Sequence, residues 1–317
     1  MGDITDLLEE QTRGPDRVHA EDTTSTAVAS TKAAPRAKSN IEPGVYTIDG
    51  YTFEHKSSRT RPIYEATIGG RKVYLKGAHG RNLNQLRTET STLTKKLGRH
   101  DHICRPCDYL RNIKDSPFEG YEFMVLPHGG ETVNDVVASG ITTNDALTIL
   151  VQVGGALTHA HSKDVVHRDI KPSNIVHDKK VAKIIDYGIG GHLGDVHHLD
   201  RFRGHGTIVY VSPEQENHED PSLHSDVYSF CATALYILTG KPPFGTKPAC
   251  IEDGILEYIT DRRFRRFVPD QIKEEFGAFG SHLIQGLSDD QGERPLAHQL
   301  YISAAGLRRE RAKQAQT

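Results

Sequence analysis

The hydrophobic periodicity of this 317-residue chain changes near residue 128. Before that point apolar and polar residues alternate, as in YTIDGYTF and PIYEATIGGRKVYLK, and a period of two predicts half-buried β-strands. The Gly-Gly pair in the second stretch predicts a turn between two strands. One stretch, residues 82–97, instead carries leucines at helical spacing. Beyond residue 128, long apolar-periodic stretches at 141–161 and 225–239 predict helices, and further helices are expected up to the C-terminus. We therefore expect an α+β chain with two lobes, and clefts between lobes are common ligand sites.

Composition narrows the class of protein. Residues 1–40 include TTSTAVASTKAAPRAKSN, which has too few apolar side chains to offset the entropy of ordering, so we predict a disordered tail. The net charge of −3 makes nucleic-acid binding unlikely. No apolar run approaches the roughly 18 residues of a membrane span, and the acidic start MGDITDLLEE does not resemble a secretory signal. We expect an intracellular, cytoplasmic protein whose C-terminal basic residues are compatible with nuclear access.

The stretch VVHRDIKPSN, residues 165–174, concentrates polar groups after an apolar run. It contains Asp169, Lys171 and Asn174, and a second acid, Asp186, follows the short predicted strand KVAKII. Two acids and an amide on loops suit a Mg-nucleotide site, because Mg²⁺ takes few protein carboxylates and shares its shell with phosphate oxygens and water. Phosphoryl transfer depends on positioning and charge neutralisation more than on covalent chemistry.

These motifs occur in the order typical of protein kinases, and residues 45–306 resemble a eukaryotic-type protein kinase domain of the serine/threonine type. The resemblance implies a bilobal α+β fold, with a small β-rich N-lobe with one main helix at about 45–127 and a larger helical C-lobe at about 128–306. A basic tail would follow at 307–317. By resemblance, Asp169 is the catalytic base that receives the substrate hydroxyl proton, and Lys171 neutralises the transferred phosphate. Asn174 and Asp186, the latter in a DYG sequence instead of DFG, would hold Mg²⁺.

The resemblance also implies nucleotide-binding residues. Lys76 would hold the ATP phosphates with Glu89 as its ion-pair partner, and the backbone of Val125 to Pro127 would be the hinge that contacts adenine. Glu131 falls where the family often holds a ribose hydroxyl. The full expected set is Lys76, Glu89, Ile63, Val125, Pro127, Glu131 and Val176.

Features of the expected C-lobe support the same family. Glu214, in SPE, would pair with Arg294, in GERP, and Asp226 would brace the loop that carries the catalytic residues. The position of Lys171, two residues after Asp169, and Thr207 in GTIVY resemble serine/threonine kinases, which implies Ser or Thr hydroxyls of proteins as acceptors.

Two departures from the family lie in the expected N-lobe. HKSSRTRPI has no glycine where the family has its glycine-rich loop, so either basic side chains replace backbone amides at the phosphates or this is a solvated basic turn. Tyr74 replaces the adenine-facing Ala and, by the period of two, shares a face with Lys76. Two main interpretations stay open: a kinase that uses ATP and Mg²⁺ on protein substrates, and a pseudokinase that acts as a binding or scaffolding module. A small-molecule phosphotransferase of related fold is a lesser alternative, and the oligomeric state is not indicated.

Overall fold

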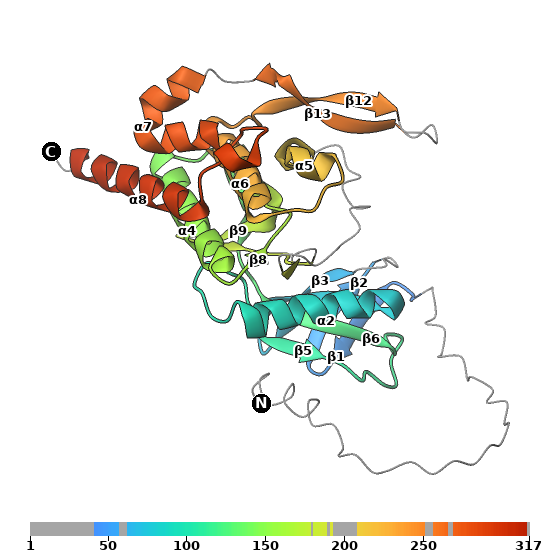
Figure 1. Ribbon diagram of the computed structural model, residues 1–317. Helices are drawn as coiled ribbons and strands as arrows, with labels where there is room; N and C mark the ends of the chain where they lie inside the picture. The colour runs from blue at the N-terminus through green and yellow to red at the C-terminus, as the bar shows by residue number, and fades with distance from the viewer. Residues whose placement is uncertain are drawn as a thin grey trace, which may run out of the picture. The chain divides into compact units, whose positions relative to one another are not determined.

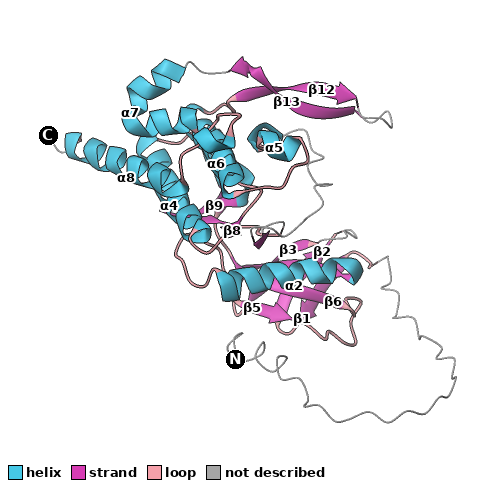
Figure 2. Cartoon of the chain, viewed as in Figure 1, coloured by secondary structure: helices cyan, strands magenta, loops and turns pink. Residues whose placement is uncertain are grey.

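The computed structural model describes residues 41–56, 62–178, 180–188, 191–192, 208–250, 256–265 and 269–315. The chain forms two compact units, the first comprising Met1–Asn84 and Pro106–Pro127 and the second Gln85–Arg105 and His128–Thr317. Strands dominate the described part of the first unit and helices that of the second (Figure 2). The predicted tail at 1–40, the centre of the glycine-free stretch at 57–61 and Thr207 lie outside the described residues.

The first unit contains a six-stranded antiparallel sheet with the strand order β1-β2-β3-β4-β6-β5. Its strands are β1 (Gly44–Ile48), β2 (Tyr51–His55), β3 (Ile63–Ile68), β4 (Arg71–His79), β5 (Asp108–Leu110) and β6 (Tyr121–Pro127). Gly69 and Gly70 connect β3 to β4 with φ values of 53° and 76°, a left-handed backbone that glycine adopts without strain. The turn predicted from the Gly-Gly pair is confirmed.

Alternation along the strands gives this sheet two different faces. The aromatic face packs into a buried cluster in which the rings of Phe53 and Tyr64 lie 4.6 Å apart between centroids. We call the opposite face the lysine face; Ile63, Lys76 and Met124 are cross-strand partners on it. Ile63 is 62% exposed there, whereas its neighbours on the aromatic face are buried. One face of the sheet therefore makes the core and the other is available for other contacts.

The second unit is built mainly from helices, several of which lie side by side (Figure 1). Its elements are α2 (Leu83–Ser91, which begins in the first unit), α3 (Val133–Ala138), α4 (Thr143–His161), α5 (Pro213–Glu216), α6 (Leu223–Thr239), α7 (Pro269–Gln285) and α8 (Ala297–Gln314). The predicted helices at 141–161 and 225–239 are confirmed as α4 and α6. Thr142 caps α4 by accepting the N–H of Asp145, and Gly240 ends α6 with φ of 70°. Helix α8 continues past residue 306, so the predicted basic tail at 307–317 is helical as far as Gln314.

Short strands complete the second unit. β7 (Glu131–Thr132), β9 (Ile175–Asp178) and β10 (Val181–Ile184) form a three-stranded sheet, and β8 (Val165–Val166) pairs with β11 (Gly191–His192). A hairpin of β12 (Phe244–Cys250) and β13 (Leu256–Arg265) lies between α6 and α7 in sequence, where only helices were expected. That expectation was wrong because LEYIT is rich in β-branched and aromatic residues, which favour strands. Within the described residues, no helix is long and apolar enough to cross a membrane.

Candidate active site

The loop after β8, residues 167–174, is held by one buried carboxylate; we call it the polar loop. Asp226, fully buried in the first turn of α6, accepts the backbone N–H groups of His167 and Arg168, each at 2.7 Å. Its Oδ2 also lies 3.1 Å from Nε2 of His161. Arg168 has a φ of 71°, which is strained for a residue with a side chain, so these bonds hold a conformation that the loop would not adopt alone. Asp226 braces the loop as the sequence implied.

Three side chains on the polar loop converge. Nζ of Lys171 lies 2.8 Å from Oδ2 of Asp169, and the amide nitrogen of Asn174 donates to the same oxygen at 2.8 Å. Asn174 also donates to the Asp169 carbonyl at 2.9 Å, and both charged side chains are 18% exposed. Burial raises the pKa of Asp169, although the Lys171 ammonium opposes that change. The loop therefore presents a positioned carboxylate whose basicity is raised beside a cation.

The second acid is tied to the polar loop through the backbone. The N–H of Ile185 donates to the Asn174 carbonyl at 2.9 Å, and Nε2 of His167 lies 3.0 Å from the Ile185 carbonyl. Asp186 follows with a φ of 63°, and its Oδ1 accepts the N–H of Gly188 at 3.2 Å. The charge of Asp186 contributes to the raised pKa of Asp169. The structure thus brings together the four polar residues that the sequence singled out.

Tyr187, between Asp186 and Gly188, is fully buried. Its ring packs edge-on against His167 with the centroids 4.4 Å apart. Its hydroxyl is buried and has no hydrogen-bond partner among the described residues. The Tyr for Phe difference noted in the sequence therefore places an unsatisfied donor in the core of the second unit.

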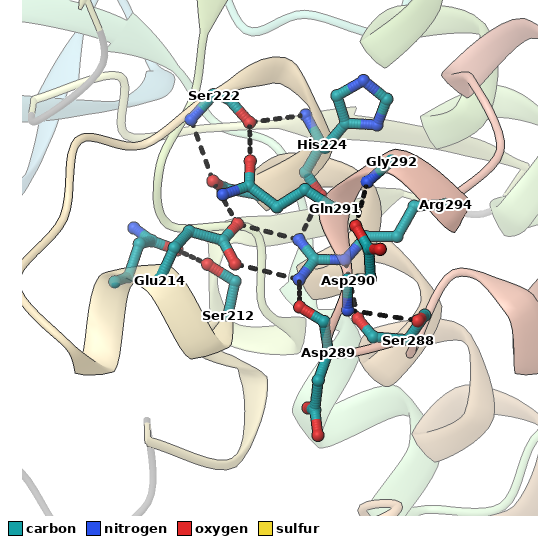
Figure 3. A network of polar contacts seen from close by, with 12 residues as sticks. Ser212, Glu214, Ser222, His224, Ser288, Asp289, Asp290, Gln291, Gly292 and Arg294 are labelled. Atoms are coloured by element: carbon teal, nitrogen blue, oxygen red, sulfur yellow. Dashed lines mark hydrogen bonds and ion pairs between the residues drawn. The ribbon is translucent and has the colours of Figure 1, made fainter.

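A buried ion pair holds the segment around Glu214 in the second unit (Figure 3). The two terminal guanidinium nitrogens of Arg294 donate to the Glu214 carboxylate, at 2.8 and 2.9 Å, and Ser225 donates its hydroxyl to Glu214 at 2.6 Å. Arg294 also donates to backbone carbonyls, among them that of Ser288 at 2.8 Å. These bonds hold the pKa of Glu214 below its usual value despite the burial that acts against them. The pair expected from SPE and GERP is confirmed as a bidentate one.

Two supporting residues were missed by the sequence reasoning. Gln215 donates its amide to the Arg168 carbonyl at 3.0 Å and accepts the Ser212 hydroxyl at 3.0 Å, so it ties SPE to the polar loop. His161 contacts Asp226 from the end of α4. A glutamine or histidine carries no signal in one sequence until its neighbours in space are known.

The first unit holds Lys76 on the lysine face of β4. Tyr74, two residues earlier, is half-buried on the same face, with Glu65 and Leu126 as cross-strand partners. Burial raises the pKa of the Tyr74 hydroxyl, and the nearby Glu65 charge adds to this. The shared face predicted for Tyr74 and Lys76 is confirmed by the register.

The remaining candidates are divided between the units. Val125 and Pro127 end β6 in the first unit, whereas Glu131 on β7 and Val176 on β9 belong to neighbouring strands of the second. A Cβ on Gly129 would approach Val176 to 2.4 Å, so the chain before β7 needs glycine there. Glu89 is buried in α2 within the second unit, so its pairing with Lys76 of the first unit stays a prediction.

Comparison with known proteins gives the class of this chain. The protein kinase domain model matches residues 67–302, most of the chain. The chain therefore belongs to the protein kinase family, and its β-rich and helical units are those of the bilobal α+β kinase fold.

Three similar curated proteins are bacterial kinases. The chain is 37% identical over 128 residues to "Serine/threonine-protein kinase PknB" of Mycolicibacterium smegmatis, covering 38% of this chain and 20% of that protein. It is 32% identical over 144 residues to the protein of the same name from Mycobacterium tuberculosis, covering 43% and 23%. A "Probable serine/threonine-protein kinase PknB" of Bifidobacterium longum is 35% identical over 120 residues, covering 36% and 17%. The matches thus span about a fifth of the length of these relatives.

Proposed function

We propose that this protein is a serine/threonine protein kinase that transfers the γ-phosphoryl group of ATP to Ser or Thr hydroxyls of proteins. The observation that carries the proposal is the convergence of Lys171 and Asn174 on Oδ2 of Asp169. The loop that holds these three residues is braced by Asp226. A phosphoryl-transfer site requires such fixed charges rather than a protein nucleophile. The similarity to PknB serine/threonine kinases supports the choice of acceptor.

In the proposed mechanism, Asp169 orients the acceptor hydroxyl and takes its proton on a carboxylate oxygen. The oxygen of that hydroxyl forms the new bond to phosphorus while the bond to the β-phosphate oxygen breaks, and ADP leaves. Burial helps here because it raises the pKa of Asp169 and so makes it a better proton acceptor. Lys171, whose Nζ lies 2.8 Å from Asp169, offsets the negative charge on the transferred group.

The donor set near this carboxylate fits Mg²⁺. Asp186 offers a carboxylate, and Asn174, whose amide nitrogen is committed to Asp169, offers its amide oxygen. Among the described residues no group of three or more His, Cys, Asp and Glu side chains could hold a metal ion. A set of few oxygen ligands suits Mg²⁺, which keeps water and phosphate oxygens in its shell. The ion supplies neutralisation of phosphate charge when bound.

The proposal includes the nucleotide-binding roles that the resemblance implies. Lys76 holds the α and β phosphates and is itself oriented by Glu89, while Ile63 and Val176 provide apolar contacts to the base. Val125 and Pro127 offer backbone groups to the base, and Glu131 offers its carboxylate to the ribose. The pseudokinase alternative keeps the same binding residues and drops the transfer step.

The test is incorporation of labelled γ-phosphate from ATP into protein, with Mg²⁺ present, by wild type and Asp169→Asn. We expect a loss of about 10² to 10⁴-fold, because an amide cannot accept the hydroxyl proton. Asp178→Asn, an exposed carboxylate at the end of β9, is the matched control and retains activity. Equal incorporation by wild type and Asp169→Asn would reject the proposal. A wild type that is stabilised by MgATP against heating but transfers no phosphate would instead be a pseudokinase.

A further inference from the structure

The end of β6 extends beyond its short neighbour β5 in the first unit. β5 begins at Asp108, whose partner is Val125, so the last two residues of β6 lie past the start of β5. On its other side β6 stays paired with β4 as far as Pro127, whose partner is Val73. The final residues of β6 therefore have one paired edge and one edge without a strand partner among the described residues.

The direction of each backbone group along this edge follows from one hydrogen bond. The N–H of Cys107 donates to the Val125 carbonyl at 2.9 Å, so the polar groups of Val125 point towards β5. Successive residues of a strand point their N–H and C=O groups to opposite sides. Those of Leu126 therefore point to β4, where Tyr74 is its partner, and those of Pro127 point to the unpaired edge.

Proline has no N–H, so Pro127 presents only its carbonyl at this edge. The carbonyl of Val125 points the same way and already accepts the Cys107 N–H. The unpaired end of β6 therefore offers one acceptor, the Pro127 carbonyl, and no donor. An ordinary residue at position 127 would add one.

We infer that this edge recognises a purine only through N–H groups that the base donates, and that the ring nitrogen N1 of adenine contributes nothing to binding. The inference rests on the proposed function, because it takes the end of β6 as the segment that meets the nucleotide base. Adenine donates from its N6 amino group, and guanine from N1–H and its N2 amino group, so both have a donor for the Pro127 carbonyl. The selection of adenine through its N1 acceptor requires a protein N–H that position 127 lacks.

The inference is tested with full-length protein and three Mg²⁺-bound nucleotides, by calorimetric titration. They are ATP, 1-deaza-ATP, in which N1 is replaced by C–H, and purine riboside triphosphate, which lacks the N6 amino group. Wild type binds ATP and 1-deaza-ATP with dissociation constants within about twofold of each other. It binds purine riboside triphosphate about tenfold more weakly, the effect of one hydrogen bond lost to a carbonyl.

The variant Pro127→Ala restores an N–H at the edge and is expected to favour ATP over 1-deaza-ATP by about tenfold. Pro43→Ala, at an exposed proline before β1, is the matched control and keeps the wild-type pattern. If the Pro127 variant does not fold, the wild-type analogue series decides alone.

Two results would overturn the inference: tenfold tighter binding of ATP than of 1-deaza-ATP by wild type, or no binding of any of the three nucleotides. The assay reads binding only and does not depend on catalysis. A protein that shows the expected binding pattern but transfers no phosphate upholds the inference and refutes the proposed kinase activity.

Discussion

The polar loop of the second unit and the lysine face of the first unit are stabilised in different ways. The polar loop depends on buried polar contacts, in which Asp226, Gln215 and Asn174 each satisfy particular backbone groups. The lysine face lies on a sheet whose core is aromatic, and the ion pair on it, Lys72 with Glu65, is 61% and 49% exposed. A buried polar contact accepts few residue types, whereas a sheet face tolerates many. Tyr74, one of the departures from the family, lies on this sheet face.

The largest effect on stability is expected when one partner is removed from an ion pair, and the comparison does this once in each unit. Arg294→Met leaves the Glu214 carboxylate buried without its bidentate cation, and we expect the free energy of unfolding to fall by about 3–5 kcal/mol. Lys72→Met removes the exposed partner of Glu65 and should cost far less, because water and salt screen an exposed ion pair.

Urea denaturation followed by circular dichroism measures both variants, since the chain has no tryptophan to report by fluorescence. Equal losses in the two variants would contradict the claim that buried polar contacts distinguish the second unit. The same holds if the Arg294 variant loses less than the Lys72 variant.

A smaller effect, with opposite signs, is expected at two buried tyrosine hydroxyls. Tyr187→Phe removes a hydroxyl without a described partner and should raise the free energy of unfolding by about 1 kcal/mol. Tyr64→Phe, on the aromatic face of the first unit, removes a hydroxyl that lies 2.7 Å from Nδ1 of His55 and should lower it by about 1 kcal/mol. The two variants make the same chemical change, so each is the control for the other. Destabilisation by both would show that the Tyr187 hydroxyl has a partner, such as a buried water.

The sequence predicted those features for which a residue pattern is compatible with only one local structure or one pairing. The periodicity of α4 and α6, the Gly-Gly turn and the pairing of Glu214 with Arg294 all follow from local rules or from motifs of fixed order. The β12–β13 hairpin was missed because the whole chain after α6 was expected to be helical. The strand propensity of LEYIT in β13 was therefore not considered.

Residues that act through long-range contacts were harder to predict. Gln215 meets the Arg168 carbonyl only because the chain folds back over 47 positions, and no local pattern marks that contact. The lack of an N–H at Pro127 was visible in the sequence, but its consequence depends on which edge of β6 the residue faces. That direction came from the bond between Cys107 and Val125.

The smallest expected effect concerns three histidines of the second unit, His100, His102 and His159. The rings of His100 and His159 lie 4.8 Å apart, and Nδ1 of His100 accepts the backbone N–H of His102 at 3.2 Å. Burial lowers the pKa of His100, and the nearby His159 and His102 lower it further. Protonation would add charge beside two other imidazoles and convert the accepting nitrogen into a donor.

The sign of the pH effect follows from this lowered pKa. The unfolded chain binds a proton at His100 more readily than the folded one, so this contribution to stability is present above the ordinary histidine pKa of 6.5 and is lost as the pH falls below it. His100→Gln keeps a side-chain acceptor but does not titrate. Its free energy of unfolding should therefore decline less than that of wild type between about pH 7.5 and about pH 5.5. The difference between the two declines should correspond to the uptake of less than one extra proton when the wild type unfolds. Urea denaturation at both pH values measures the difference. Equal declines would show that the histidine cluster takes up its proton without loss of stability, and that, unlike the polar loop, it does not depend on a fixed pattern of donors and acceptors.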